Sequence, residues 1–286
     1  MSNNELITAD KLIEKIEIPA QPELLVAINR ESKKGQCDFD LVADMISSDI
    51  SIASEVLKTV NSPLFGLNQT ITSIQQAVGL LGLLRVIALV RDVSLRQLVS
   101  DGLDLSKFWM AASKDAQICG LIATQSKIID PEEAYTFGLF HNAGIPILMQ
   151  NYPDYEEQMQ GDSMLPGIEA TKAEDRVYKV NHAIVGYYLC DKWFLPEHIC
   201  KALFYHHRSH LVFKKIKKYD DPFVILLALL VTAQHIAGEK EGAANEEEYP
   251  QHWKAMQPKL RKIFRLDEDG YNDLINNTKE QLLQSV

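Results

Sequence analysis

The sequence predicts an all-α fold, a multi-helix bundle of two packed helical subdomains. Three observations lead to this prediction. Apolar residues recur at helical spacing along most of the 286 residues, and helix start and stop signals stand at the ends of these segments. In addition, no segment shows the sustained period-two alternation that marks a half-buried strand.

The first helices are predicted from local signals. Pro22 can occupy the first turn of a helix over residues 23–32, which Gly35 ends. Apolar residues then repeat at helical spacing over residues 41–46. Asp49 or Ser51 can cap the next helix, over residues 52–60. It is expected to end at Asn61-Ser62-Pro63, because proline disfavours a helical residue before it.

A longer apolar segment follows over residues 77–90. Ser73 can cap it, and Gln76 three residues later completes a capping box. Gly79 and Gly82 within this helix suit a close approach of a second helix, although they are also read as small residues that the helix tolerates.

The segment Asp101-Gly102-Leu103-Asp104 separates this block from a second series of helices. We therefore divide the chain into an N-terminal helical subdomain over residues 1–102 and a helical bundle with a C-terminal extension over residues 103–286. Asp130-Pro131 followed by two glutamates is a strong helix start. The apolar run over residues 223–233 predicts a buried core helix.

Composition excludes several classes of protein. A formal net charge of −10 argues against nucleic-acid binding, because an acidic surface repels phosphate. The apolar runs over residues 77–90 and 223–233 are shorter than a membrane span requires. The four cysteines show no CxxC spacing, which indicates reduced thiols, and the N-terminus has no secretory signal pattern. We therefore expect a cytoplasmic protein that binds neither nucleic acid nor membrane.

Histidines mark the candidate site. His141 lies in the apolar run FGLFHNAGIPIL beside Asn142, His182 opens the helix HAIVGYYLCDKW, and His206 and His207 close another helix. Histidines on successive helices of a bundle can project into a shared interior and bind a metal. A histidine on an apolar helix face can equally be a hydrogen-bonded core residue, and the residues alone leave both readings open.

The order of these segments resembles the HDOD family, a regulatory branch of the HD-domain metal-dependent phosphohydrolases. In the first block, IPAQPELL, SSDISIASEVLKTVNSPLFG and TSIQQAVGLLGLLRV carry the resemblance. FWMAAS, EEAYTFGLFHNAG, HAIVGYYLCDKWFLP and ALFYHH carry it in the second. The resemblance covers about residues 15–235, and it implies that the second subdomain is HD-domain-like.

It also implies that most catalytic ligands of an active HD domain are missing. The first histidine ligand would fall near Ala111, the aspartate of the His-Asp pair is Asn142, and the late aspartate would fall near Gln234. We therefore expect no catalytic residues and no bound metal. The vestigial pocket would consist of His141, Asn142, His182, His206 and His207, in which the polar groups satisfy one another. If a divalent transition metal binds, its expected ligands are His141, His182 and His206.

The resemblance implies a bacterial signal-transduction protein that acts through a protein partner or by sensing a small ligand. The alternative is a metal-dependent phosphohydrolase, a phosphomonoesterase or phosphodiesterase, with an atypical ligand set. Nucleotide binding without hydrolysis is a third reading. The single basic run, over residues 214–218, is compatible with a phosphate or nucleotide partner, but we expect a solvated loop answered by Asp220 and Asp221.

Overall fold

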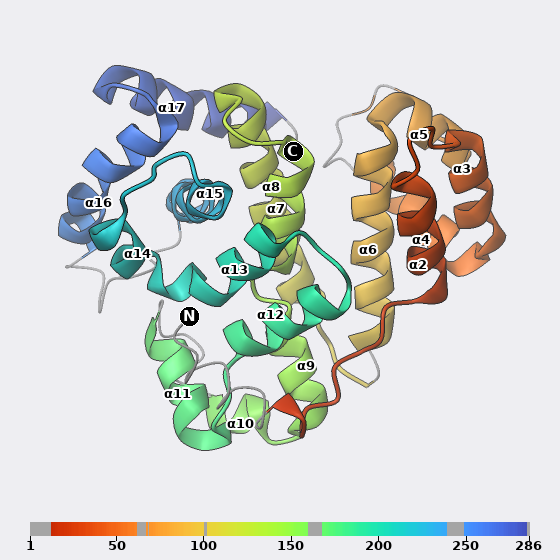
Figure 1. The fold of residues 1–286 in the computed structure, drawn as a ribbon, viewed down its shortest axis with the longest axis horizontal. Coiled ribbons are helices and arrows are strands. Elements are labelled where there is room, and N and C mark those ends of the chain that lie inside the picture. Colours follow the sequence, from red (N-terminus) through yellow and green to blue (C-terminus); the bar gives the residue numbers. More distant parts are fainter. Residues whose placement is uncertain are drawn as a thin grey trace. The chain divides into compact units, whose positions relative to one another are not determined.

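The computed structural model describes residues 13–61, 67, 69–99, 102–159, 168–238 and 249–284. Within these residues every regular element is a helix, so the all-α prediction is confirmed. The chain packs as two compact units (Figure 1). Of the described residues, those within 20–103 and 280–284 belong to the N-terminal unit, and those within 13–19 and 104–279 belong to the C-terminal unit.

The helices of the N-terminal unit are α2 to α6, and helices were predicted at the positions of α2, α3 and α4. Contacts of α6 with α2, α4 and α5 build the core of this unit. The bounds are α2 Glu23–Ser32, α3 Phe39–Ser48, α4 Ile50–Val60, α5 Ile74–Leu81 and α6 Leu83–Val99.

Predicted caps in this unit are present in the structure. Asp49 accepts a hydrogen bond from the backbone N–H of Ile52 at the start of α4, and Ser73 accepts one from the N–H of Gln76 at the start of α5. The Gln76 side chain reaches back to the N–H of Thr72 at 2.8 Å, one residue before the cap. The predicted stop at Ser62-Pro63 lies outside the described residues.

Asn61, the last residue of that stop signal to be described, has a clear structural role. Its amide nitrogen donates to the carbonyls of Leu57 and Ile71, both at 2.8 Å. Its oxygen accepts from the N–H of Ile71 at 2.7 Å. The side chain thus pairs with both backbone groups of Ile71, as a strand would, and fixes the chain after α4 against the segment that leads into α5.

The expectation of a single helix over residues 77–90 is wrong, and so is the one of the two readings in which Gly79 and Gly82 admit a neighbouring helix. Gly82 has φ 85° and ψ 155°, a backbone conformation accessible almost only to glycine, and it separates α5 from α6. A Cβ atom built on Gly79 or Gly82 would meet nothing within 4 Å. Gly82 therefore serves to turn the chain, and neither glycine makes room for a helix.

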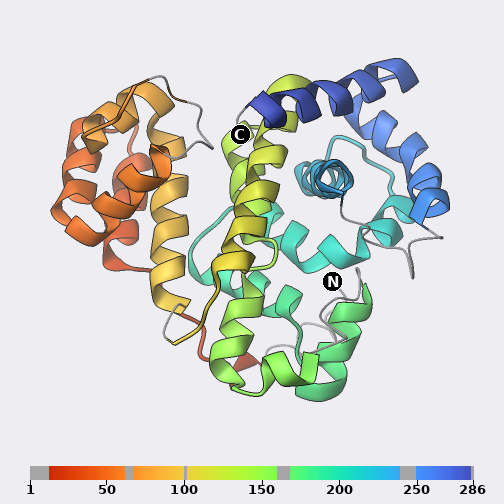
Figure 2. The same ribbon diagram turned by 180° about the vertical axis from the view of Figure 1, so that it is seen from behind.

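The C-terminal unit surrounds a central apolar helix, α15 Pro222–Ala237. In Figure 1 this helix is seen end-on, with α7, α13, α14 and α16 around it, and each of these contacts it. In the view from behind (Figure 2), the long helix α7 lies beside α15. Side chains on nearly every side of α15 are buried, as expected for a helix that is apolar all round. The prediction of a buried core helix over residues 223–233 is therefore confirmed.

The other helices of this unit wrap α15 or carry the histidines. Their bounds are α7 Ser106–Ser126, α8 Pro131–Phe140, α9 Gly144–Asn151, α10 Tyr155–Met159, α11 Ile168–Tyr178, α12 His182–Lys192, α13 Glu197–Tyr205, the 3₁₀ turn η2 His206–Arg208, α14 Ser209–Lys215, α16 Tyr249–Phe264 and α17 Glu268–Gln284. Asp130 caps α8 as predicted, by accepting from the N–H groups of Glu132 and Glu133.

Residues 13–19 belong to the C-terminal unit although they precede the N-terminal one. Asn151 accepts from the N–H of Glu17 at 2.8 Å, and Lys192 Nζ donates to the carbonyl of Ile18 at 2.8 Å. The buried Trp193 indole N–H donates to the carbonyl of Pro19 at 3.2 Å. These bonds tie the segment to the ends of α9 and α12.

No helix among the described residues has both the length and the hydropathy needed to cross a bilayer.

His235, near the end of α15, predicts an acid-sensitive step in stability. Its ring stacks on Trp253 with the centroids 3.7 Å apart, and burial, with Lys279 nearby, lowers its pKa to about 4. An unfolded chain binds this proton near pH 6.5. The stabilising contribution is therefore complete above pH 6.5 and is lost as the pH falls from 6.5 towards 4.

Because the imidazole is partly exposed, we expect this loss to be limited to about 1 kcal/mol. Urea unfolding at several pH values would measure it. His235→Phe keeps the stacked ring and removes the titration, so its stability should change less between pH 7 and pH 5 than that of the wild type. Parallel pH profiles for the two proteins would contradict the assignment.

Candidate functional site

Four histidines, on loops and helix ends that are far apart in sequence, converge inside the C-terminal unit. His182 is the first residue of α12, His206 and His207 form the η2 turn after α13, and His141 follows the last residue of α8. His141, His182 and His206 are each at most 2% exposed. The ring centroids of His141 and His182 both lie 5.5 Å from that of His206.

Glycines bring the backbones close enough for this convergence. A Cβ atom on Gly144, at the start of α9, would lie 2.0 Å from the carbonyl oxygen of His182. A Cβ on Gly138 in α8 would lie 2.8 Å from the Cα of Ala116 in α7. The small residues of the GLFHNAG segment therefore permit α8 to pack on α7 and α9 to pack on α12, with His141 between these two contacts.

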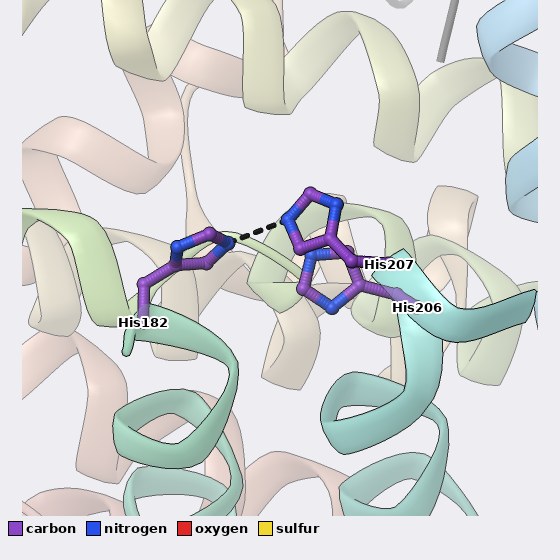
Figure 3. A group of neighbouring side chains, drawn as sticks. All are labelled: His182, His206 and His207. Atoms are coloured by element: carbon purple, nitrogen blue, oxygen red, sulfur yellow. Dashed lines mark hydrogen bonds between the residues drawn. The ribbon is translucent and has the colours of Figure 1, made fainter. Parts of the chain in front are cut away.

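The ligand atoms of His182, His206 and His207 all lie within 4.8 Å of one another (Figure 3). The Nε2 atoms of His182 and His207 face each other at 2.7 Å, so a hydrogen bond between them needs one proton shared by the two rings. Of the residues predicted to form the pocket, these three are the closest set. His141 stands beside them and packs edge-on against His206.

Buried acceptors fix the ring orientations. Nδ1 of His182 lies 2.7 Å from Oε2 of Glu174, Nδ1 of His206 lies 2.5 Å from the carbonyl of Leu203, and Nδ1 of His141 lies 2.7 Å from the carbonyl of Gly138. A carbonyl or carboxylate only accepts, so each Nδ1 carries the proton and donates it. In a neutral ring of this kind the lone pair is on Nε2.

His206 is held in the neutral form. Burial lowers the pKa of its ring well below the ordinary histidine value, and the neighbouring His207, His141 and His182 lower it further. Its Nε2 lies 3.1 Å from Oδ1 of Asn142, and a half-turn of that amide would present its NH₂ group to the lone pair. Asn142 therefore serves as a neutral hydrogen-bonding partner of His206.

Glu174, in α11, is a residue of the candidate site that the sequence did not indicate. It is 2% exposed and accepts from the N–H and Nδ1–H of His182 and from the hydroxyl of Tyr155. Burial alone would raise the pKa of this carboxyl, but the electrostatic interaction with His182 and the hydrogen bonds from His182 and Tyr155 outweigh it and lower the pKa. Burial and Glu174 in turn raise the pKa of Tyr155, which keeps it a neutral donor.

A second buried carboxylate, Asp115 in α7, lies near His141, with Oδ2 3.8 Å from Nε2. Neither carboxylate carries a sequence signal, since Glu174 is eight residues before His182 and Asp115 is 26 residues before His141. The two other positions that the resemblance singled out are unlike ligands. Ala111 is exposed on α7, and Gln234 is buried in α15 with no hydrogen bond to the described histidines.

The donor set fits only part of the metal chemistry that the resemblance to HD-domain proteins implies. Three imidazoles that converge, two of them with Nδ1 fixed by acceptors, fit one divalent ion with nitrogen ligands. They do not fit a pair of ions bridged by a carboxylate, because Asn142 replaces that carboxylate with a neutral amide and Glu174 is engaged with His182 and Tyr155.

Comparison with known proteins shows what the chain is similar to. A curated protein of Treponema pallidum, described as uncharacterized, is 26% identical over 193 residues, which are 67% of this chain and 38% of that protein. The chain therefore matches less than half the length of this relative.

Solved structures share the fold. An HDOD domain protein of unknown function from Geobacter sulfurreducens superposes with a TM-score of 0.74 at 20% identity, over 100% of this chain and 97% of that one. A Shewanella amazonensis protein described as a candidate phosphohydrolase gives 0.68 at 20% identity, covering 96% and 95% of the two chains. A Marinobacter aquaeolei protein described as a candidate signal transduction protein gives 0.66 at 19%, covering 99% and 64%.

The model of the HDOD domain matches residues 18–209, about two thirds of the chain, and this range includes α2 to α13 and all four histidines. The match and the fold agree with the resemblance drawn from the sequence motifs. The chain is a member of the HDOD domain family.

Proposed function

We propose that this protein is a regulatory component of a signalling pathway that acts by binding, through a protein partner or a small ligand, and does not hydrolyse phosphoesters. The observation that carries the proposal is Asn142, whose amide lies 3.1 Å from His206 Nε2 at the position where the resemblance implies a metal-bridging aspartate. An amide neither offsets the charge of a metal pair nor lowers the pKa of a water that bridges it.

The buried carboxylates do not restore that chemistry. In the described structure, both carboxylate oxygens of Glu174 accept hydrogen bonds, and the donors are His182 and Tyr155. Its role is to orient an imidazole, and it leaves no oxygen to activate water. The site is thus suited to hold an occupant in a fixed geometry, which is what a sensing or structural site requires.

A metal remains compatible with a binding role. His182, His206 and His207 would hold it, with Glu174 supporting His182 from behind. A late divalent transition ion suits imidazole ligands, and when bound it would act as a Lewis acid towards an oxygen ligand. The chain's own contribution is to keep a proton on Nδ1 of His182, which donates to Glu174, and on Nδ1 of His206, which donates to the Leu203 carbonyl, so that the Nε2 lone pairs are directed towards the shared interior.

The alternative proposal is a metal-dependent phosphohydrolase with an atypical ligand set. The specific observation in its favour is the same three-histidine group, which offers three nitrogen ligands in a buried site. The two proposals differ in whether turnover accompanies binding.

Turnover assays can separate them. The wild-type protein, supplied in turn with Zn²⁺, Mn²⁺, Ni²⁺ and Fe²⁺, would be assayed with a phosphomonoester and a phosphodiester of p-nitrophenol. His182→Ala is the matched variant, and the metal content of both would be measured by elemental mass spectrometry. We expect no hydrolysis above that of the variant, whether or not the wild type retains metal. Sustained turnover that disappears in His182→Ala would overturn the regulatory proposal and support the hydrolase.

A further inference from the structure

A pocket of about 590 Å³ lies on the side of the C-terminal unit formed by the end of α13, the η2 turn, α14 and the start of α15. Its size is typical of pockets that bind a small organic ligand. None of the four histidines of the cluster lines this pocket, so the pocket and the cluster are different sites. The two are nevertheless adjacent in sequence, because Tyr205 and Arg208 of the pocket flank His206 and His207.

The pocket is basic on a protein that is acidic. Its charged lining consists of five cations and one acid, a net charge of about +4 (five minus one), whereas the whole chain has a formal charge of −10. Among the described residues none of the five cations is within 4.0 Å of a carboxylate oxygen. The five are Lys201, Arg208, Lys215, Lys217 and Lys218.

The single acid offsets only one of the five positive charges, and it is also engaged in a hydrogen bond to the backbone. Asp221 caps α15 by accepting from the N–H of Phe223 at 3.2 Å. The sequence suggested that Asp220 and Asp221 answer the lysine run 214–218 as a solvated loop. The lysines of the run are exposed, as expected, but Asp221 bonds to the start of α15, and Lys215, Lys217 and Lys218 line the same pocket as Lys201 and Arg208.

The rest of the lining is apolar and aromatic. Tyr205 and Phe223 contribute rings whose centroids are 5.9 Å apart, and Leu211, Val212 and Ile216 contribute aliphatic groups. Lys201 Nζ lies 4.2 Å from the centroid of the Phe223 ring, so one of the cations is held in place by an aromatic face. A ligand complementary to this pocket has a multiply charged anionic part and a flat, weakly polar part.

We propose that this pocket binds a nucleoside diphosphate or triphosphate. The phosphate groups would be held by the lysines and Arg208, and the base and sugar would lie against the Tyr205 and Phe223 side. The inference does not depend on the role of the histidine cluster. Binding here would contact the residues on both sides of His206 and His207, so the η2 turn is a direct physical link between the two sites.

The test is calorimetric titration of the full-length protein with ADP at 0.15 M salt, in the presence of EDTA so that no metal at the histidines contributes. Inorganic pyrophosphate and adenosine are the two part-ligands. We expect ADP to bind, with pyrophosphate at least about tenfold weaker and adenosine weaker still, because each lacks one half of the complementary chemistry. Pyrophosphate binding as tightly as ADP would overturn the proposal in favour of a general anion site.

Adjacent lysines supply a matched pair of variants. Lys215 lines the pocket, whereas Lys214 is its neighbour in α14, is also exposed and does not line it. We expect Lys215→Glu to weaken ADP binding by about tenfold or more, and Lys214→Glu to change it by less than about twofold. Equal losses of ADP affinity in the two variants would mean that the general positive charge of this surface attracts the nucleotide. That result would overturn the proposal that the pocket binds it. Absence of any ADP heat up to millimolar concentration would do the same.

Discussion

Replacing Gly144 with alanine is expected to lower the free energy of unfolding of the C-terminal unit by about 3 kcal/mol or more. The new Cβ would lie 2.0 Å from the carbonyl oxygen of His182 and 2.9 Å from the N–H nitrogen of Gly186. Both are backbone atoms of α12, which cannot rotate out of the way as a side chain can. The only relief is for α9 and α12 to move apart, and the core between them would lose its close packing.

Gly186→Ala is the matched control, because Gly186 also lies at the contact between α9 and α12, but the nearest atom to its added Cβ belongs to a side chain. A Cβ there would meet Cδ2 of Leu203 at 3.1 Å, and a small rotation of that leucine restores normal contact. We expect a loss of about 1 kcal/mol for this variant. Urea unfolding followed by circular dichroism and by tryptophan fluorescence would compare the two. Equal losses would contradict the idea that backbone contact at Gly144 sets the spacing of α9 and α12.

Gly144→Ala should also disturb the histidine cluster, since the new Cβ would clash with the carbonyl oxygen of His182. If the fold survives at low temperature, the 2.7 Å contact between the Nε2 atoms of His182 and His207 is the first that a shift of α12 would lengthen. Imidazole proton signals in NMR spectra would report this directly. The small residues of the GLFHNAG segment thus define the site as much as the histidines do.

The parts of the fold that follow from local chemistry could be predicted from the sequence. The starts of α5 and α8 depend on Ser73 and on Asp130, each of which bonds to backbone N–H groups within three residues. The core helix α15 was predictable because its composition is apolar on all sides. The break at Gly82 was not, because a glycine with positive φ has the same sequence signature as one that admits a neighbouring helix.

The candidate site was predictable only in part for a related reason. The four histidines stood out because they interrupt apolar helices and match a family pattern. Glu174 did not, because its partner His182 belongs to a different helix and no spacing rule links them. The basic pocket was also missed, since the sequence shows the lysine run but not that Lys201 and Arg208, from earlier elements, face the same space.

Replacing Glu174 with glutamine is expected to cost about 2–3 kcal/mol of stability, although the two side chains are nearly the same size. The carboxylate is buried and accepts from three donors, namely the N–H and Nδ1–H of His182 and the hydroxyl of Tyr155. A glutamine has one oxygen to accept with, and its NH₂ group would face a donor. At least one buried donor would therefore lose its partner.

Glu133→Gln is the control, because Glu133 also pairs with a histidine but does so near the surface. Its Oε2 lies 3.0 Å from Nε2 of His198, with the side chains 35% and 26% exposed. Solvent can replace that interaction, so we expect a change within about 0.5 kcal/mol. Urea unfolding at pH 7 would measure both variants, and a loss at Glu174 no larger than that at Glu133 would contradict a structural role for the buried carboxylate.

The same pair of variants tests whether the carboxylate organises a ligand site. Glu174 keeps the proton of His182 on Nδ1 and so directs the Nε2 lone pair towards His206 and His207. In Glu174→Gln the amide can accept or donate, and the ring is free to adopt the other tautomer or turn over. Zn²⁺ affinity, measured by competition with a chromophoric chelator, should then fall by about 10–100-fold, while Glu133→Gln leaves it unchanged. Equal Zn²⁺ affinity in all three proteins would mean that the histidines and Glu174 form a polar core, in which the carboxylate stabilises the fold and binds nothing further.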